Sequence, residues 1–341
     1  MESHKCAIIN KLINITNCRN YIFCSYTRNC LFLLLKALNI GEGDEIIVPA
    51  FTCQSICEVI YAVGAKPVLV DTEVESINIS PIKLVEEITS KTKMIYVIHA
   101  FGISAQIDII SKIAKENSIY LVEDLSHILN GTFKGQKLGT FGDFVILSFT
   151  KTMVSYQGGA VGTNNFCIYM KMKTLQNTLI ASIERKNNHF FYYFYRLLCS
   201  IWECRGSVVV LLIFKLVSCI KGKRHINKLH KINKDFFNIS KFSFFIIDMQ
   251  LSKQLSKKYI TKRNNIYLKK TKSEKSYVYY PAIHEGQTGL MPNHICGSII
   301  RKSKIKQFFS LEIWPDTIIE TKSLNAEKLY KTLRLFAKKV W

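Results

Sequence analysis

The feature that most constrains the fold is the alternation of short apolar segments with helix-like segments over the first 165 residues. Strands are predicted at 44–49, 66–71, 93–99, 119–124 and 141–149, and helices at 29–38, 54–64, 80–88 and 107–117. Strands that are apolar on both faces and separated by helices form mostly parallel sheets, because the helices cover both faces. The sequence therefore predicts an α/β fold.

The composition, and the way in which residue types change along the chain, suggest how it is divided into domains. The 341 residues can bury a large core, and 48% apolar residues against 21% charged ones fit a globular chain. We expect a large α/β domain over residues 1–235, followed at 236–341 by a long helix from about Phe242 and a small C-terminal α+β domain. Within the large domain, residues 189–224 form an aromatic and apolar insertion that is predicted to be helical.

The net charge of +22 is unevenly distributed, since residues 221–275 hold 16 Lys or Arg against three acidic residues. Two interpretations of 189–224 and this basic stretch stay open: buried helices or a dimer contact, and an amphipathic segment lying on an anionic membrane. A bilayer span needs about 20 apolar residues, and the longest apolar run, Val208–Phe214, is far shorter. The sequence has no recognisable nucleic-acid-binding module, so no nucleic-acid partner is expected.

Cysteine usage and the start of the sequence bear on metal binding and location. Cys53 and Cys57 are four residues apart, but no second pair follows at metal-ligand spacing, so no metal site is expected among the 11 cysteines. The first residues include Glu2 and lack the sustained apolar centre of a secretory signal. We therefore expect a cytoplasmic protein, at the inner face of the membrane if 189–224 contacts lipid.

Three polar residues stand at predicted strand ends, where ligands bind in sheets of this kind. Asp124 ends one apolar strand, His127 follows three residues later, and Lys151 follows another. Singly, each has an ordinary explanation as a capping carboxylate, a packed imidazole or a surface charge. Together they suit pyridoxal 5'-phosphate, with the amine forming a Schiff base and the carboxylate keeping the ring nitrogen protonated. Glu123 is expected to point to the opposite face of its strand.

The phosphate of such a cofactor favours the backbone N–H groups of a helix N-terminus. The helix that starts near Thr27, Arg28 and Asn29 is the first candidate. A pair of glycines, Gly158 and Gly159, follows Lys151 by seven and eight residues and is expected to turn the chain beneath the cofactor.

The chain also resembles a known family, the DegT/StrS family of pyridoxal-phosphate-dependent sugar aminotransferases, which have the type I fold of aspartate aminotransferase. The resemblance covers nearly all of residues 25–165. The matching stretches are LNIGEGDEIIVPAFT, VIYAVGAKPVLVD, KTKMIYVIHAFGISAQIDIISKIAKENSIYLVEDLSH, GQKLGTFGDFVILSF and GGAVGTNN. They occur in the family's order and at its spacing.

This resemblance implies roles for individual residues. Lys151 forms the covalent bond to the cofactor and later shuttles a proton, and Asp124 pairs with the pyridinium nitrogen. His127 occupies the place where the family has glutamine or histidine near the phenolic oxygen, and Ser148 contacts the phosphate. A histidine at position 151 would have excluded transamination; the residue is lysine.

At the phosphate turn the chain departs from the family. The usual Ser-Gly-Thr reads Tyr26-Thr27-Arg28, so Thr27 and Arg28 stand where the family's phosphate-binding turn begins, without its glycine. Cys53 sits where many relatives place an aromatic residue that stacks on the cofactor ring.

The implied function is an aminotransferase that converts a keto group of a nucleotide-linked sugar to an amine, with an amino-acid donor such as glutamate, for glycan or polysaccharide biosynthesis. The resemblance also implies a homodimer whose active sites lie between two subunits. Two alternatives stay open: a non-catalytic or regulatory relative, suggested by the altered phosphate turn and a short C-terminal part, and a membrane-surface scaffold.

Overall fold

The computed structural model describes residues 2–73, 78–100, 104–153, 155, 157–179 and 239–254. It also describes four short strands, β10 (Tyr277–Val278), β11 (Thr288–Leu290), β12 (Ile299–Ile300) and β13 (Ile305–Gln307).

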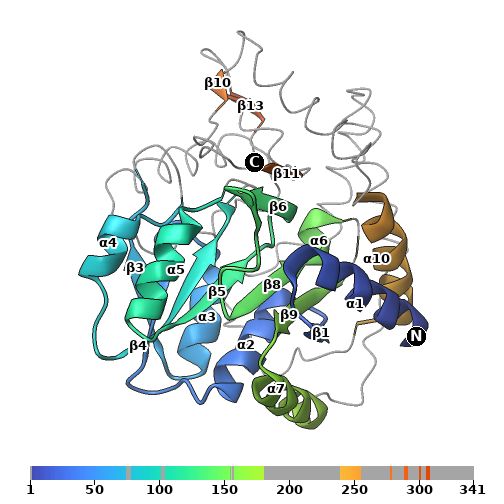
Figure 1. The fold of residues 1–341 in the computed structure, drawn as a ribbon, viewed down its shortest axis with the longest axis horizontal. Coiled ribbons are helices and arrows are strands. Elements are labelled where there is room, and N and C mark those ends of the chain that lie inside the picture. The colour runs from blue at the N-terminus through green and yellow to red at the C-terminus, as the bar shows by residue number, and fades with distance from the viewer. Residues whose placement is uncertain are drawn as a thin grey trace, which may run out of the picture.

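A seven-stranded sheet forms the centre of the fold (Figure 1). Its strands, in spatial order, are β1 (Asn20–Cys24), β9 (Gly159–Thr163), β8 (Phe144–Ser148), β5 (Tyr120–Asp124), β4 (Thr92–Ile98), β2 (Glu45–Pro49) and β3 (Lys66–Val70). The five from β8 to β3 run parallel, and β9 runs antiparallel to both of its neighbours. The expected mostly parallel α/β sheet is confirmed.

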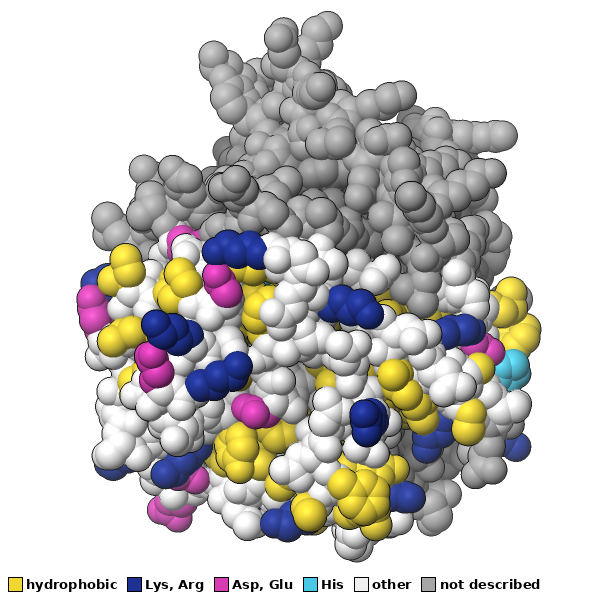
Figure 2. All heavy atoms as spheres, viewed as in Figure 1, with side chains coloured by type: hydrophobic (Ala, Val, Ile, Leu, Met, Phe, Trp, Pro, Cys, Tyr) yellow, Lys and Arg dark blue, Asp and Glu magenta, His cyan; other side chains and the backbone are white. Residues whose placement is uncertain are grey.

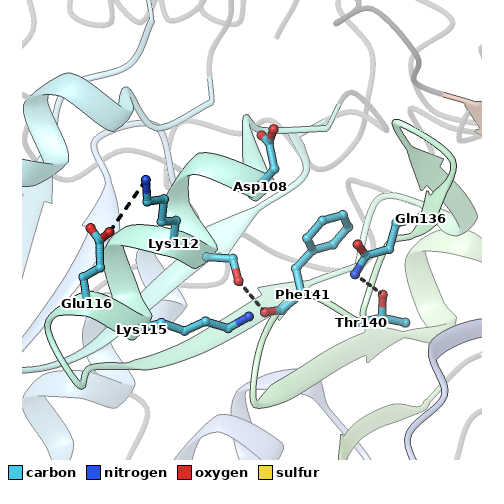
Figure 3. A pocket seen from close by; sticks show the side chains of 8 residues that line it. Asp108, Lys112, Lys115, Glu116, Gln136, Thr140 and Phe141 are labelled. Carbon is cyan, nitrogen blue, oxygen red and sulfur yellow. Dashed lines mark hydrogen bonds and ion pairs between the residues drawn. The ribbon is translucent and has the colours of Figure 1, made fainter.

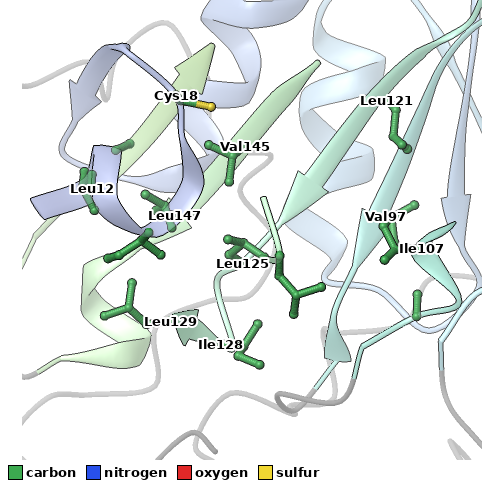
Figure 4. Close-up of a cluster of buried hydrophobic side chains, with 14 of the residues drawn as sticks. Leu12, Cys18, Val97, Ile107, Leu121, Leu125, Ile128, Leu129, Val145 and Leu147 are labelled. Atoms are coloured by element: carbon green, nitrogen blue, oxygen red, sulfur yellow. The ribbon is translucent and has the colours of Figure 1, made fainter. Parts of the chain in front are cut away.

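Helices cover both faces of this sheet and create two hydrophobic clusters. On one face pack α2 (Thr27–Ala37), α3 (Gln54–Ala62) and α7 (Phe166–Leu179). On the other pack α1 (Glu2–Thr16), α4 (Pro81–Glu86), α5 (Ile107–Glu116) and α10 (Lys241–Gln254). Figure 4 shows part of the second cluster, in which Leu12 of α1 lies near Leu147 of β8. Strands β2 and β8 are buried along their whole length, which explains the apolar runs 46–49 and 144–147 within them.

The predicted helices begin and end close to their expected positions. The helix expected at 80–88 is α4, where Ser80 accepts a hydrogen bond from the Lys83 N–H at 3.4 Å and Pro81 occupies the first turn, as predicted. The long helix expected from Phe242 is α10 as far as Gln254, and its continuation lies outside the described residues.

Beyond the large sheet, short strands join two smaller sheets. In one, β11 pairs with β6 (Leu129–Phe133), which also pairs with β7 (Gln136–Lys137); in the other, β12 lies between β10 and β13. Helix α10 packs into the second cluster through Phe244, Ile247 and Leu251. The domain boundary at 235/236 stays a prediction, and the helix expected near the C-terminus lies outside the described residues.

Charges on the face seen in Figure 2 are mixed, with Lys or Arg and Asp or Glu side chains interspersed. The basic stretch at 221–275 falls mostly outside the described residues, and so does the 189–224 segment. None of the helices in the described part is both long and apolar enough to cross a bilayer. A search of the same residues finds no group of three or more His, Cys, Asp or Glu arranged to hold a metal ion.

Candidate active site

Two neighbouring strands bring three of the predicted site residues to one edge of the large sheet. Asp124 is the last residue of β5 and Ser148 is the last residue of β8. The two strands are parallel, with Asp124 opposite Ile146, so both chains leave the sheet at the same edge. The short helix α6 (Phe149–Thr152) continues directly from β8 and carries Lys151.

Lys151 and His127 contact each other at this edge. Lys151 Nζ lies 3.1 Å from His127 Nε2, and both side chains are partly exposed. A ring nitrogen at this distance either accepts a hydrogen bond from the ammonium form of lysine or donates one to the neutral amine. The predicted amine and imidazole are therefore within reach of each other for proton transfer.

Asp124 is held from two sides. It is 4% exposed, and its Oδ2 accepts a 2.7 Å hydrogen bond from the Tyr96 hydroxyl while its Oδ1 accepts a 2.7 Å bond from the Ser126 N–H. Burial, and after it the nearby Asp124 charge, raise the pKa of Tyr96 well above its ordinary value. The phenol therefore stays protonated and acts as a donor. Tyr96 was not selected from the sequence, although a polar aromatic residue within a buried strand signals a hydrogen-bond partner.

Glu123 faces the opposite side of the sheet, as strand alternation predicts. Its two carboxylate oxygens accept 2.7–2.8 Å hydrogen bonds from three backbone N–H groups of the loop 139–142, and Oε2 lies 3.4 Å from His99 Nε2. His99 Nδ1 accepts from the Ala105 N–H at 3.2 Å, so Nε2 carries the ring proton and donates it to Glu123. Both side chains are fully buried. Glu123 therefore anchors a loop and contributes nothing to the Asp124 side.

The N-terminus of α2 lies against the start of β9. Gly159 pairs with Cys24 of β1 on one side and with Ser148 of β8 on the other. A Cβ placed on Gly159 would lie 2.6 Å from the Thr27 nitrogen, so the first turn of α2 fits only against a glycine. Tyr26 precedes the helix and makes no side-chain cap, which leaves the first backbone N–H groups without this partner. The close approach at the predicted phosphate turn thus depends on Gly159, a glycine of the facing strand.

Two polar side chains line this part of the edge. The Arg28 guanidinium lies over the Tyr26 ring, with Cζ 4.5 Å from the ring centroid, which directs the cation back over the turn. Ser148 is buried, and its hydroxyl lies 3.1 Å from the Thr150 hydroxyl. Thr27 and Arg28 are therefore the first two residues of α2, and Ser148 ends β8 opposite Gly159.

Cys53 lies on the same face as Asp124, at the start of α3. Its Sγ is 3.1 Å from the Ser55 hydroxyl, and its side chain packs against the hydrophobic cluster that includes Tyr96. The preceding residue, Thr52, is 2% exposed, and its hydroxyl has no hydrogen-bond partner among the described residues. A buried hydroxyl in this condition marks a place where a ligand can supply the missing partner.

A surface pocket shown in Figure 3 lies elsewhere, between α5 and the loop that follows β7. Its walls are formed by Asp108, Ser111, Lys112, Lys115, Glu116, Gln136, Thr140 and Phe141. The polar groups largely satisfy one another: Ser111 donates to the Phe141 carbonyl at 2.8 Å, and Gln136 donates to Thr140 at 3.0 Å. None of the predicted site residues lines this pocket, so it is separate from the Lys151 edge.

Fold and site together define a class. The central sheet with one antiparallel strand, β9, and helices on both faces has the architecture of type I pyridoxal-phosphate-dependent transferases. The chain belongs to the DegT/DnrJ/EryC1/StrS aminotransferase family, whose sequence model matches residues 11–228. The matched region contains every predicted site residue.

Named relatives agree with this assignment. GDP-perosamine synthase of Vibrio cholerae is 32% identical over 205 residues, which is 59% of this chain and 54% of the relative. The dTDP-3-amino-3,6-dideoxy-alpha-D-galactopyranose transaminase of Aneurinibacillus thermoaerophilus is 36% identical over 152 residues, 44% of this chain and 42% of the relative. The chain spans about half the length of these curated relatives.

The fold similarity extends further than the sequence similarity. The aminotransferase TlmJ of Streptoalloteichus hindustanus superimposes with a TM-score of 0.62 at 17% identity, over 84% of this chain and 68% of that one. At this identity the match concerns the fold alone.

Proposed function

We propose that the chain is a pyridoxal-phosphate-dependent aminotransferase that converts a keto group of a nucleotide-linked sugar to an amine, with an amino acid such as glutamate as donor. The observation that carries this proposal is the 3.1 Å contact between Lys151 and His127 at the sheet edge where Asp124 is held. Membership of the aminotransferase family supports it. The names of the two relatives specify a GDP-linked and a dTDP-linked sugar, so keto sugars linked to either nucleotide should be tested as substrates.

The residues at this edge fit the cofactor. A phosphate needs the backbone N–H groups of a helix N-terminus, and the glycine at position 159 lets the first turn of α2, which begins at Thr27, pack closely against β9. Ser148, opposite Gly159, offers a hydroxyl donor, and Arg28, over the Tyr26 ring, offers a cation. The buried Thr52 hydroxyl and the partly exposed Cys53 lie on the ring side of the site in this proposal.

Each side chain has a defined task. Lys151 would supply the amine that holds the cofactor and the base that moves a proton. His127 positions that amine through its Nε2 and, as the family resemblance implies, also lies near the phenolic oxygen. Asp124 holds a proton on the ring nitrogen. When bound, pyridoxal phosphate supplies the electron sink that amino-group transfer requires.

The proposal extends to partners and location. We propose a homodimer whose active sites are completed by the second subunit, in a cytoplasmic enzyme with no nucleic-acid partner that serves glycan or polysaccharide biosynthesis. Peripheral membrane contact through 189–224 is the further prediction for the segment outside the described residues. Sedimentation velocity tests the dimer, and flotation with anionic vesicles before and after deletion of 189–224 tests the membrane contact.

Borohydride trapping tests the central proposal. Purified protein incubated with pyridoxal phosphate should gain a visible absorbance band that borohydride removes, and peptide mass spectrometry should then find the reduced cofactor on Lys151. Addition of L-glutamate should shift the band before reduction. Labelling of another lysine, with none on Lys151, would exclude the assignment. A trapped cofactor on Lys151 without any response to a panel of amino donors would instead favour a non-catalytic relative.

A further inference from the structure

Tyr96 is a buried side chain that no role described above uses directly. It lies in the middle of β4, is 1% exposed, and reaches the carboxylate of a residue on the neighbouring strand. Tyr96 pairs with Val122 and Asp124 pairs with Ile98, so the hydroxyl crosses diagonally toward the end of β5. Alternation along both strands places Tyr96 and Asp124 on the same face.

The two hydrogen bonds to Asp124 come from different parts of the fold. Tyr96 donates to Oδ2 from the adjacent strand, and the Ser126 N–H donates to Oδ1 from the connection that follows β5. Donors on both oxygens fix the plane of the carboxylate. An ionised carboxylate accepts at about four lone-pair positions. Two remain for a ligand after these bonds are made.

We propose that Tyr96 is a positioning residue that acts through Asp124, aiming its carboxylate at the ring nitrogen of pyridoxal phosphate. This inference rests on the proposed function. If Tyr96 acts in this way, its hydroxyl should affect the affinity only for a ligand that has a hydrogen-bonding ring nitrogen. A purely structural tyrosine affects every ligand of the site to the same extent.

The chain offers a matched control in Tyr21. This tyrosine is 2% exposed, its hydroxyl is hydrogen-bonded to the Thr16 hydroxyl, and it packs in the cluster on the other face of the sheet. Tyr21→Phe therefore removes a buried phenolic hydrogen bond of the same kind, away from Asp124.

The experiment compares two ligands on the full-length apo protein. Pyridoxal phosphate and its 1-deaza analogue, in which carbon replaces the ring nitrogen, are titrated by absorbance and fluorescence into wild type, Tyr96→Phe and Tyr21→Phe. Loss of a hydrogen bond to a charged group predicts that Tyr96→Phe binds pyridoxal phosphate about tenfold more weakly, with a shifted absorbance band. Its affinity for the deaza analogue should match that of wild type. Tyr21→Phe should bind both ligands normally.

A double-mutant cycle with Asp124→Asn supplies a second measurement. In the Asn background, Tyr96→Phe should change the affinity for pyridoxal phosphate less than about twofold, because the carboxylate through which it acts is gone. Equal weakening of both ligands by Tyr96→Phe, or unchanged binding and spectrum, overturns the positioning role while the proposed function stands. If wild type binds neither ligand, the proposed function fails, and the inference fails with it.

Discussion

Glu123 and Asp124 are adjacent carboxylates with opposite surroundings. Glu123 is fully buried and receives three backbone N–H groups and the His99 N–H, all from this chain. Asp124 receives two donors, from Tyr96 and Ser126, and lies on the edge where Lys151 and His127 meet. One strand end thus anchors a loop on one face of the sheet and, in the proposed function, presents a carboxylate to the cofactor on the other.

The comparison separates stability from activity at the level of single residues. The fold itself positions the backbone N–H groups around Glu123, so this carboxylate has its hydrogen-bond partners without any ligand. The Asp124 side combines side chains that meet only at this edge. Substitutions on the Glu123 side should therefore reduce the free energy of unfolding, and substitutions on the Asp124 side should mainly reduce activity.

The largest effect is expected for Lys151→Ala. If Lys151 holds the cofactor and transfers a proton, as proposed, loss of its amine should lower the rate of the glutamate half-reaction by at least about 10⁴-fold. The free energy of unfolding without cofactor should change by less than about 1 kcal/mol, because the side chain is partly exposed. Stopped-flow absorbance and urea denaturation measure the two quantities. Lys93→Ala, which removes an exposed lysine of β4, should leave both unchanged.

Asp124→Asn should follow, with a half-reaction about 10²- to 10³-fold slower, the range found when one preorganised electrostatic group is removed from an active site. Asparagine still accepts one of the two hydrogen bonds from Tyr96 and Ser126, so unfolding should change by only about 1 kcal/mol. Reaction rates and denaturation midpoints on the same preparation give both numbers. A variant that loses stability but retains its rate would assign Asp124 to the structural side.

Glu123→Gln should give the reverse pattern. The amide nitrogen would face backbone N–H groups of the loop 139–142, and a buried ionic acceptor would be lost. We expect a loss of about 3 kcal/mol in the free energy of unfolding. The folded Glu123→Gln variant, loaded with cofactor, should retain the rate of the glutamate half-reaction within about threefold, since nothing on the Asp124 side changes. A selective loss of rate with normal stability would contradict the division between the two faces.

Much of this division could be predicted from sequence because it depends on local patterns. The apolar run 119–124 predicted a buried strand, and alternation alone placed Glu123 and Asp124 on opposite faces. Ser80 and Pro81 likewise marked the start of α4. In each case the residues that decide the outcome are neighbours in the chain.

The features that were missed depend on segments brought together by the fold. The partners Tyr96 and Asp124 are 28 residues apart, and their contact requires the register between β4 and β5. The role of Gly159 at the turn before α2 likewise requires β9 to lie beside β1.

Helix α1 was also not predicted, although its signal is local: Ile8, Leu12 and Ile15 recur at helical spacing and are buried.

Asp248 extends the comparison to a third carboxylate, held by side chains from another helix. It lies on α10 and accepts hydrogen bonds from Lys11 and from His4 Nδ1, both on α1. Burial raises the pKa of Asp248, but the hydrogen bonds from Lys11 and His4 outweigh it, and the net shift is downward. Because its pKa is lowered, the ionised Asp248 stabilises the fold fully at pH values above the ordinary aspartate pKa. This stabilisation is lost as the pH falls through the pKa of Asp248 in the folded protein.

Asp248→Asn should therefore be the mildest substitution, costing about 0.5–1 kcal/mol of unfolding free energy at pH 7, the range of partly exposed ion pairs. The difference from wild type should begin to shrink as the pH falls to the ordinary aspartate pKa of about 4, and it should vanish only below the lowered native pKa, where the wild-type carboxyl is protonated in both states. Denaturation curves between pH 3 and 7 measure it, and added salt should shrink the difference at pH 7. A difference that does not shrink at all between pH 7 and pH 3 would show that packing, rather than charge, makes Asp248 contribute.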